Sequence, residues 1–271
     1  MRLVSDWDTV VSLVASCRNE GLVSTNFFPD EARMSAWCRD GVFFEERCGG
    51  TQFFARKQPG FHNMYFMSKS PGALAVDLRS FLSFHGNERW IADLIGPDSV
   101  RQPLESAFAS CGFDPLTTLQ RMGRRTSVGD FPRQPGVEQA KPEDAANVKA
   151  LLDGYFVAEE EQLPSLEEVI KWIDSGTLLL VRGEAGDGIL GFVIFDLCPA
   201  ALYLRYWFVH PDSRGRGVGG RLMKAMFAAG RGTKRQYFWV RTDNENAITR
   251  YRHYGFQFEP MKDVVMAHSP T

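Results

Sequence analysis

Hydrophobic residues recur along this chain with two spacings, which predict strands in some segments and helices in others. Residues 201–209 (Ala-Leu-Tyr-Leu-Arg-Tyr-Trp-Phe-Val) are rich in aromatic and aliphatic side chains and predict a strand. Directly afterwards, apolar side chains at 218, 222, 223, 226 and 227 recur at helical spacing and predict a helix. The prediction for the second half is, in order: strand 136–140, helix 142–156, helix 165–175, strand 177–182, a turn at 186–188, strand 188–197, strand 201–209, the helix from 218 and strand 236–241.

The first half has a similar mixture of strands and helices. Its prediction is, in order: strands 42–47 and 51–56 joined through Cys48-Gly49-Gly50, a strand near 63–67, helix 72–84, strand 90–95, helix 99–110 and a strand from 113 to 122. Both halves end with a strand, a helix, Gly-Phe and a closing strand, and Gly112-Phe113 matches Gly255-Phe256. This order predicts a degenerate internal repeat.

The chain length and a segment rich in proline and glycine favour two domains. A chain of 271 residues suits one large domain or two of about 130. Residues 129–142 are rich in proline and glycine, which is typical of a linker. We therefore predict domains at 1–130 and 131–271, of the α/β (α+β) class, with mixed sheets flanked by helices.

Composition excludes some classes of function. Hydrophobic residues make up 44% of the chain and charged residues 24%, which is ordinary for a soluble globular protein. The net charge of −2 argues against a nucleic-acid-binding protein, because phosphate contacts need clustered lysine and arginine. No membrane span and no signal peptide is evident, so we expect a cytoplasmic protein with no nucleic-acid and no membrane partner.

Cysteine and histidine positions suggest no metal and no thiol chemistry. Five cysteines are dispersed without a close pair, which predicts free thiols. No repeated spacing of His, Asp or Glu suggests a metal site, so none is assigned. His210 and His253 lie near the motifs described below, and neither is assigned a role.

The segment between the strand 201–209 and the helix from 218 is rich in glycine and arginine. Its sequence is His210-Pro-Asp-Ser-Arg-Gly-Arg-Gly-Val-Gly-Gly220. Unpaired N–H groups and the positive end of the helix dipole lie at a helix N-terminus, and glycine lets a ligand approach the backbone closely. Arg214 and Arg216 add two permanent positive charges. We predict a site for a phosphate or pyrophosphate.

Two other phosphate-binding folds are poorer explanations of this turn. Gly215, Gly217 and Gly220 satisfy G-x-G-x-x-G, and Asp243 lies roughly where a ribose-binding acid would fall. A dinucleotide-binding domain needs further β-α units, however, and only residues 221–271 follow. A P-loop is excluded because no Gly-Lys-Ser/Thr follows the turn.

Read as Arg-x-x-Gly-x-Gly, from Arg214 through Gly217 and Gly219, the turn resembles the acyl-CoA pyrophosphate loop of the GNAT superfamily of N-acetyltransferases. A second motif follows strand 236–241: residues 244–256 resemble the family's Asn-x-x-Ala-x-x-x-Tyr-x-x-x-Gly-Phe segment. The resemblance covers about 136–266. It implies tandem GNAT-like mixed sheets, of which the C-terminal half is an acyl-CoA-binding GNAT domain.

The resemblance also implies roles for individual residues, with acetyl-CoA as co-substrate. Phe208 and Val209 would offer backbone groups to the pantetheine arm and the thioester carbonyl, and Asn244 would contact the cofactor. Tyr251 would be the general acid beside the thioester sulfur, with Tyr254 as a competitor; a phenol can donate a proton to a departing thiolate. The pyrophosphate would be held by Arg214, Gly215, Arg216, Gly217, Val218, Gly219 and Gly220.

The general base is left open by the sequence. An alkylammonium with a pKa of about 10 must lose a proton before it can attack. Many family members carry a glutamate on the central strand, but 201–209 has no carboxylate. The run 159–161 (Glu-Glu-Glu) supplies possible bases acting through a water, or a solvated loop. Tyr206 and Asp196 are further candidates, and Arg205 would bind a substrate carboxylate or pair structurally.

The expected activity is direct transfer of an acetyl group to an amine in a ternary complex. The acceptor is a small molecule or a peptide, and a homodimer is among the expected arrangements. Residues 96–103 have no glycine cluster where the second half has its pyrophosphate turn, so the first half is not expected to bind CoA. It would cover the acceptor pocket, hold the sheet edge or dimerise. The alternative function is a non-catalytic acyl-CoA-binding sensor or scaffold.

Overall fold

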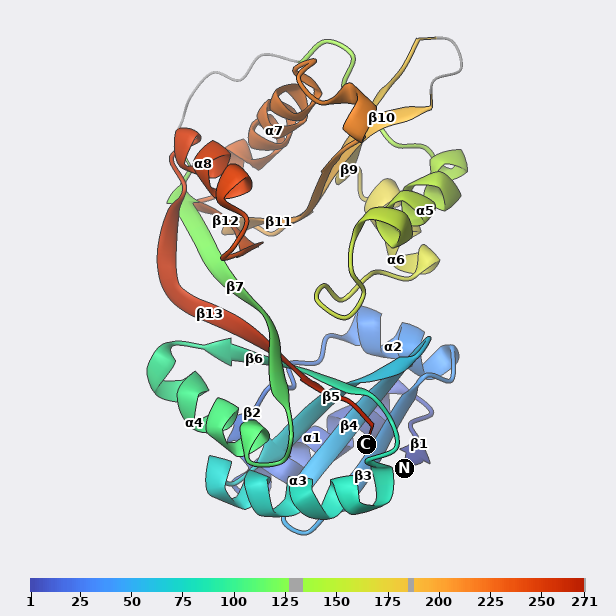
Figure 1. The fold of residues 1–271 in the computed structure, drawn as a ribbon. Helices are drawn as coiled ribbons and strands as arrows, with labels where there is room; N and C mark the ends of the chain where they lie inside the picture. The colour runs from blue at the N-terminus through green and yellow to red at the C-terminus, as the bar shows by residue number, and fades with distance from the viewer. Residues whose placement is uncertain (127–133, 185–187, 271) are drawn as a thin grey trace. The chain divides into compact units, whose positions relative to one another are not determined.

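The computed structural model describes residues 1–126, 134–184 and 188–270, which form two compact units (Figure 1). Unit 1 contains residues 1–120 and the chain from Pro260 onward, and unit 2 contains residues 121–259. In each unit a mixed sheet is flanked by helices, which confirms the predicted fold class.

Unit 1 has strands in the order β1-β3-β4-β5-β6-β13, in which only β5 and β6 are parallel neighbours. The short strand β2 pairs with β5 off this path. Its elements are β1 (Arg2–Leu3), α1 (Trp7–Asn19), β2 (Ser24–Thr25), α2 (Glu31–Arg39), β3 (Phe43–Cys48), β4 (Thr51–Gln58), β5 (Phe61–Ser68), α3 (Pro71–His85), β6 (Trp90–Gly96), α4 (Asp98–Ala109), the start of β7 (Asp114–Arg125) and most of β13 (Gln257–His268).

Hydrophobic cores lie on both faces of the unit 1 sheet. Successive side chains of a strand point to opposite faces, and β4 sends Phe53 toward α3 and α4 and Phe54 toward α1 and α2. The sequence analysis assigned no elements before residue 42. Helix α1 nevertheless buries Val10, Val14 and Cys17, which recur at helical spacing.

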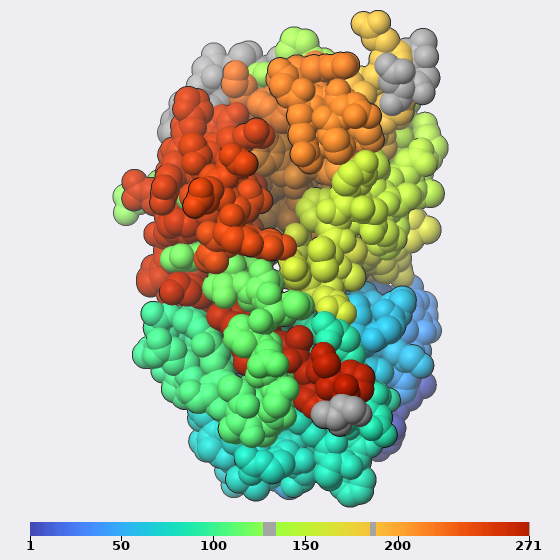
Figure 2. Space-filling view, viewed as in Figure 1, coloured from blue at the N-terminus to red at the C-terminus, as the bar shows by residue number. Residues whose placement is uncertain are grey.

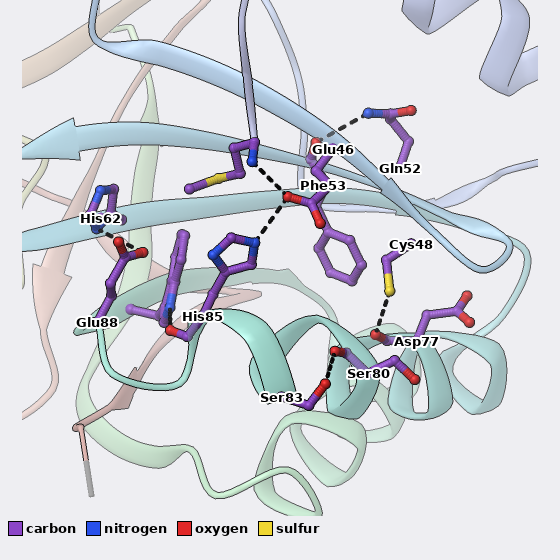
Figure 3. A network of polar contacts seen from close by, with 12 residues as sticks. Glu46, Cys48, Gln52, Phe53, His62, Asp77, Ser80, Ser83, His85 and Glu88 are labelled. Carbon is purple, nitrogen blue, oxygen red and sulfur yellow. Dashed lines mark hydrogen bonds and ion pairs between the residues drawn. The ribbon is translucent and has the colours of Figure 1, made fainter.

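The predicted hairpin of β3 and β4 is confirmed, and α3 holds its turn. Gly49 has φ +56°, and a Cβ there would lie 2.0 Å from Asp77 Oδ1 of α3. Thr51 donates a hydrogen bond to the same carboxylate at 2.7 Å. At the other end of α3, the His85 ring lies 2.9 Å from Glu46 of β3 (Figure 3). Glycine at position 49 therefore lets the turn and the helix meet.

Unit 2 has strands in the order β7-β12-β11-β10-β9-β8, in which β11 and β12 are parallel. The strands and helices predicted for the second half are all present, with ends shifted by a few residues. The elements are β8 (Glu138–Gln139), α5 (Ala145–Tyr155), α6 (Leu166–Asp174), β9 (Leu178–Arg182), β10 (Ile189–Leu197), β11 (Ala201–Val209), α7 (Val218–Ala229), β12 (Arg235–Arg241) and α8 (Glu245–His253).

The unit 2 sheet is also covered on both faces. Strand β10 sends Val193 and Phe195 into the cluster formed with α7 and α8, and Phe192 and Ile194 into the cluster formed with α5 and α6. Such a strand, buried on both faces, has a continuous apolar sequence instead of an alternating one.

The predicted internal repeat is present in the order of elements. Both units have two helices, three antiparallel strands, a helix, a parallel strand, a helix and a last strand. Gly112 and Gly255 each end a helix, with φ of +84° and +82°. The following N–H, of Phe113 or Phe256, donates to the carbonyl five residues earlier, at 3.2 and 3.1 Å respectively. The Gly-Phe match is therefore the same helix-ending motif in each unit.

One part of the repeat was aligned wrongly from the sequence. Helix α3 links the parallel strands of unit 1, as α7 does in unit 2, so the counterpart of the glycine-rich turn is Lys69-Ser70 before α3. Residues 96–103 instead begin α4, which corresponds to α8. The Ser70 hydroxyl accepts the N–H of Ala73 at 3.2 Å and so caps α3. One of the N–H groups in the first turn of α3 is thus already hydrogen-bonded to the chain itself.

The compact units do not divide the chain at 130 and 131. They divide at 120 and 121 and again at 259 and 260. Residues 262–268 of β13 pair with β6, and this pairing joins the end of the chain to unit 1. Residues 127–133 of the linker-like segment lie outside the described residues, as do residues 186 and 187 of the turn predicted at 186–188.

Some further features concern the described residues only. None of their helices combines the length and apolar character that crossing a membrane requires. Their His, Cys, Asp and Glu side chains form no group of three or more that could hold a metal ion. All five cysteines are free thiols.

Candidate functional site

The parallel strands β11 and β12 separate after a short ladder. Their pairs run from Ala201↔Arg235 to Tyr203↔Tyr237, and no later pair joins them among the described residues. The other edge of β11 remains paired with β10 as far as Val209. Backbone groups along the β12-facing edge of residues 204–209 therefore have no strand partner there and are free for a ligand.

A bulge in β11 lies where the two strands separate. Ile194 of β10 pairs with Tyr206, and the next residue, Phe195, pairs with Leu204, so Arg205 is the extra residue. A bulge bends a strand and increases its twist. It accounts for the course of β11 away from β12.

Arg205 and Asp196 are engaged with one another. The Arg205 Nε lies 2.6 Å from Asp196 Oδ2, and the Trp172 indole donates to Asp196 Oδ1 at 2.8 Å. The question left open for Arg205 is thus answered by a structural ion pair. Asp196 is a poor candidate base, because both of its oxygens already accept hydrogen bonds.

The glycine-rich turn forms the junction of β11 and α7. Gly215 and Gly217 have φ of +80° and +75°, a region that costs other residues about 1–2 kcal/mol. The first helical bond of α7 runs from the Arg221 N–H to the Gly217 carbonyl, at 3.1 Å. The N–H groups of Val218, Gly219 and Gly220 precede that bond and remain available to an anion.

Arg214 and Arg216 precede these N–H groups in the turn and are exposed. Within the described ranges, neither guanidinium has an ion-pair partner. The turn therefore combines backbone donors, a helix dipole and two unpaired positive charges, a donor set that fits a pyrophosphate.

Close packing fixes the direction of α7. A Cβ on Gly219 would lie 2.9 Å from the Trp207 ring, and one on Gly191 of β10 would lie 2.7 Å from the Phe208 carbonyl oxygen. Only glycine allows these approaches, so α7 begins at the end of β11, beside Phe208 and Val209.

Tyr251 packs against both of the separated strands. Its ring centroid lies 4.0 Å from that of Phe238 on β12 and 5.5 Å from that of Trp207 on β11. The side chain is only 8% exposed. Burial, together with the charge of Glu161, raises the pKa of Tyr251, so the phenol keeps its proton at neutral pH.

Tyr254 and Asn244 occupy other parts of α8. The Tyr254 ring packs on Phe227, and its hydroxyl lies near Gly220 of α7. Asn244 begins α8, where its Oδ1 accepts the N–H of Ala247 at 3.1 Å. Since that oxygen is used as a helix cap, the exposed amide nitrogen is the group left for a ligand.

The segment between α5 and α6 is attached to both separated strands. The Tyr206 hydroxyl of β11 donates to the Gln162 carbonyl at 3.0 Å. Arg241, the last residue of β12, forms an ion pair with Glu160. Glu161 lies between these two attachments. In Figure 2 the surface is hollowed between the orange α7, the red-orange α8 and the yellow-green segment after α5.

Glu161 has a strongly perturbed carboxyl group. Burial and the charge of Glu160 raise its pKa to about 7, against the opposing effect of Arg241. A carboxyl group with a pKa near neutrality can accept and release protons under physiological conditions. The sequence signal was the run of glutamates, and it did not distinguish Glu161 from its neighbours.

The histidines noted in the sequence lie at the edge of this region. His210 Nδ1 accepts the N–H of Asp212 at 3.4 Å, and its Nε2 lies 3.4 Å from the Tyr155 hydroxyl. His253 is exposed on α8.

Comparison with known proteins agrees with this geometry. Residues 145–256 match the model of the Acetyltransferase (GNAT) family. The chain is similar to a tandem GNAT protein from the clavulanic acid biosynthesis pathway, at 16% identity and a TM-score of 0.63 over 99% of this chain and 97% of that one. It is also similar to a putative GNAT acetyltransferase from Novosphingobium aromaticivorans, at 18% identity and a TM-score of 0.55 over 86% and 93%. A search among curated proteins found no match.

Proposed function

Residues 145–256 form a GNAT domain and the whole chain has the fold of tandem GNAT proteins, and on this premise we propose that the protein transfers an acetyl group from acetyl-CoA to an amine. The two substrates would bind together, and no covalent enzyme intermediate would form. Free thiols at all five cysteines suit a reducing compartment, so the cytoplasm is the proposed location.

The proposed acetyl-CoA site extends from the glycine-rich turn to the gap between β11 and β12. The N–H groups of residues 218–220, with Arg214 and Arg216, would bind the pyrophosphate. The unpaired edge of Phe208 and Val209 would hydrogen-bond the pantetheine arm, and Asn244 would contact the cofactor from α8. Acetyl-CoA supplies the acetyl group as a thioester.

Tyr251 is the proposed general acid. Its burial keeps the phenol protonated, so it can donate a proton to the thiolate that leaves when the carbon–sulfur bond breaks. Its contacts with both strands support a place beside the thioester.

One arrangement carries the proposal most directly: β11 and β12 separate after Tyr203↔Tyr237, α7 begins with unpaired donors at the end of β11, and the buried phenol of Tyr251 packs against both strands. A helix N-terminus alone would fit many anions. A helix start with free donors, an unpaired strand edge and a protonated phenol on neighbouring elements together fit a thioester with a pyrophosphate group.

Calorimetric titration tests the cofactor. Acetyl-CoA is expected to bind the wild-type protein, and the Arg214→Ala/Arg216→Ala variant should bind at least about tenfold more weakly, because charge-assisted hydrogen bonds are lost. NAD, titrated in parallel, should not bind. A preference for NAD, or equal affinity of the variant for acetyl-CoA, would contradict the proposal.

The alternative is a non-catalytic acyl-CoA sensor or scaffold, supported by the absence of a carboxylate on β11. The two functions differ in turnover. Release of free CoA thiol with a panel of amines would identify an enzyme. Tight acetyl-CoA binding with no turnover on any amine class would favour the sensor.

A further inference from the structure

We infer that the carboxylate of Glu161 takes the proton from the acceptor ammonium, and that the contacts of its two neighbours in the chain hold it at the gap between β11 and β12. This inference rests on the proposed function and adds to it the group that activates the acceptor. It implies an acceptor that arrives as a cationic primary amine.

The backbone on both sides of Glu161 is fixed. On one side Glu160 is paired with Arg241 of β12, and on the other the Gln162 carbonyl accepts the hydroxyl of Tyr206 on β11. The Glu161 N–H also donates to the Val157 carbonyl at 2.9 Å, which closes a turn. Because β11 and β12 have separated at these positions, a residue held between the two attachments lies across their gap.

Glu161 is electrostatically coupled to phenols from two elements that line the gap. Its charge raises the pKa values of Tyr206 on β11 and of the proposed acid, Tyr251, on α8. Interactions of this kind weaken steeply with distance and screening. The proposed acid and the inferred base therefore belong to one site.

The neighbouring carboxylates are already engaged. Glu160 is paired with Arg241, and Asp196 with Arg205 and Trp172. Glu168 accepts the N–H of Ser165 at 2.8 Å as part of a capping box. Glu161, by contrast, makes no side-chain hydrogen bond or ion pair with any residue that the structure describes.

Burial and the charged groups around Glu161 set its pKa, and with it the pH above which its carboxylate can accept a proton. Its raised pKa is about 7, with burial as the main cause. Glu160 raises this pKa further and Arg241 lowers it, while the nearby Tyr206 and Tyr251 remain neutral because their pKa values are raised. Above about pH 7 the carboxylate form predominates and can accept a proton.

The proton balance of the reaction then closes without a further reactant. Glu161 takes one proton from the ammonium, and the freed nitrogen lone pair forms the carbon–nitrogen bond with the thioester carbonyl. As the carbon–sulfur bond breaks, Tyr251 donates its proton to the sulfur. The second proton of the nitrogen returns to the Tyr251 oxygen, and the proton on Glu161 passes to water.

The first test compares Glu161 with the nearby Glu159 and with a distant glutamate, using an amine on which the wild-type protein is active. Glu161→Gln should lower kcat/KM by about 10² to 10⁴-fold while acetyl-CoA affinity, measured by calorimetry, stays unchanged. Glu143→Gln, at an exposed position just before α5, is the matched control and should keep full activity. The inference is overturned if Glu161→Gln retains activity, or if Glu159→Gln shows the loss instead.

The second test measures how kcat/KM depends on pH. In the wild-type protein kcat/KM should rise with pH through about 7 as Glu161 loses its proton. Glu160→Gln removes a negative charge and should move this rise to lower pH, and Arg241→Gln removes a positive charge and should move it to higher pH. Shifts in the same direction, or none, would contradict the inference. A wild-type protein inactive on every amine would instead refute the proposed function.

Discussion

At the scale of single residues, one pair of matched positions in the two units differs by a hydroxyl group. Tyr251 and Phe108 each lie five residues before the phenylalanine of Gly-Phe, and each carbonyl accepts that residue's N–H. Both side chains are buried. Packing would be satisfied by phenylalanine in either unit, so the hydroxyl of Tyr251 calls for a chemical explanation.

Tyr251→Phe removes this hydroxyl and keeps the ring contacts with Trp207 and Phe238. We expect turnover to fall by about 10² to 10⁴-fold, since the leaving thiolate loses its acid. Acetyl-CoA affinity and the free energy of unfolding should change little. Steady-state kinetics, calorimetry and urea denaturation measure the three quantities. Tyr254→Phe is the matched control, and a larger loss of turnover in that variant would assign the acid to Tyr254.

At the scale of elements, the decisive junction is that of β11 with α7. The glycines serve different purposes: Gly217 supplies a positive φ before the helix, and Gly219 allows close contact with β11. Alanine usually stabilises a helix relative to glycine by about 1 kcal/mol. At position 219 the added Cβ would press against Trp207, so alanine should lower the free energy of unfolding there instead of raising it.

Gly219→Ala should therefore destabilise the protein, by about 1–3 kcal/mol as is usual for overpacking, and should weaken acetyl-CoA binding. Gly154→Ala on α5 is the matched control, because its Cβ would meet nothing within 4 Å. It should stabilise the protein by up to about 1 kcal/mol and leave affinity unchanged. Urea denaturation and calorimetry measure both variants. Equal effects at the two positions would show that the contact with β11 is unimportant.

At the scale of the whole molecule, two units of similar topology differ in whether the gap between their two parallel strands is open. In unit 1 the parallel strands also separate early, after His62↔Trp90 and Asn63↔Ile91. There the gap is bridged by Asn26, whose side-chain amide nitrogen donates to the carbonyls of Met64 and Asp93 at 3.1 Å each. The adjacent β2 pairs with β5, so the chain itself occupies this place.

We therefore expect one acetyl-CoA to bind per chain. The capped start of α3 and the bridge of Asn26 leave unit 1 without the open features of unit 2. Calorimetry should give a stoichiometry near one for the wild-type protein, and no second class of sites should remain in the Arg214→Ala/Arg216→Ala variant. Two sites per chain, or residual tight binding in the variant, would contradict this expectation.

Local signals explain why much of the fold was predictable. Alternating and continuous apolar runs identified the strands of the second half, and the prediction for 201–209 matches β11 in full. The division into units was less predictable, because it depends on the pairing of residues 262–268 with β6, far away in sequence. A strand's sequence shows that it will be paired and leaves its partner open.

The sequence by itself determined the glycine-rich turn proposed to bind the pyrophosphate, because its glycines, its two arginines and the start of a helix are local properties of residues 214–220. It also indicated the internal repeat through the shared strand, helix, Gly-Phe and closing strand, but not its first two helices in unit 1. Only the tertiary structure decided that the carboxyl group of Glu161 has a perturbed pKa. The reason is physical: burial and the pairing of Glu160 with Arg241 depend on elements distant in sequence, and these set the pKa of Glu161.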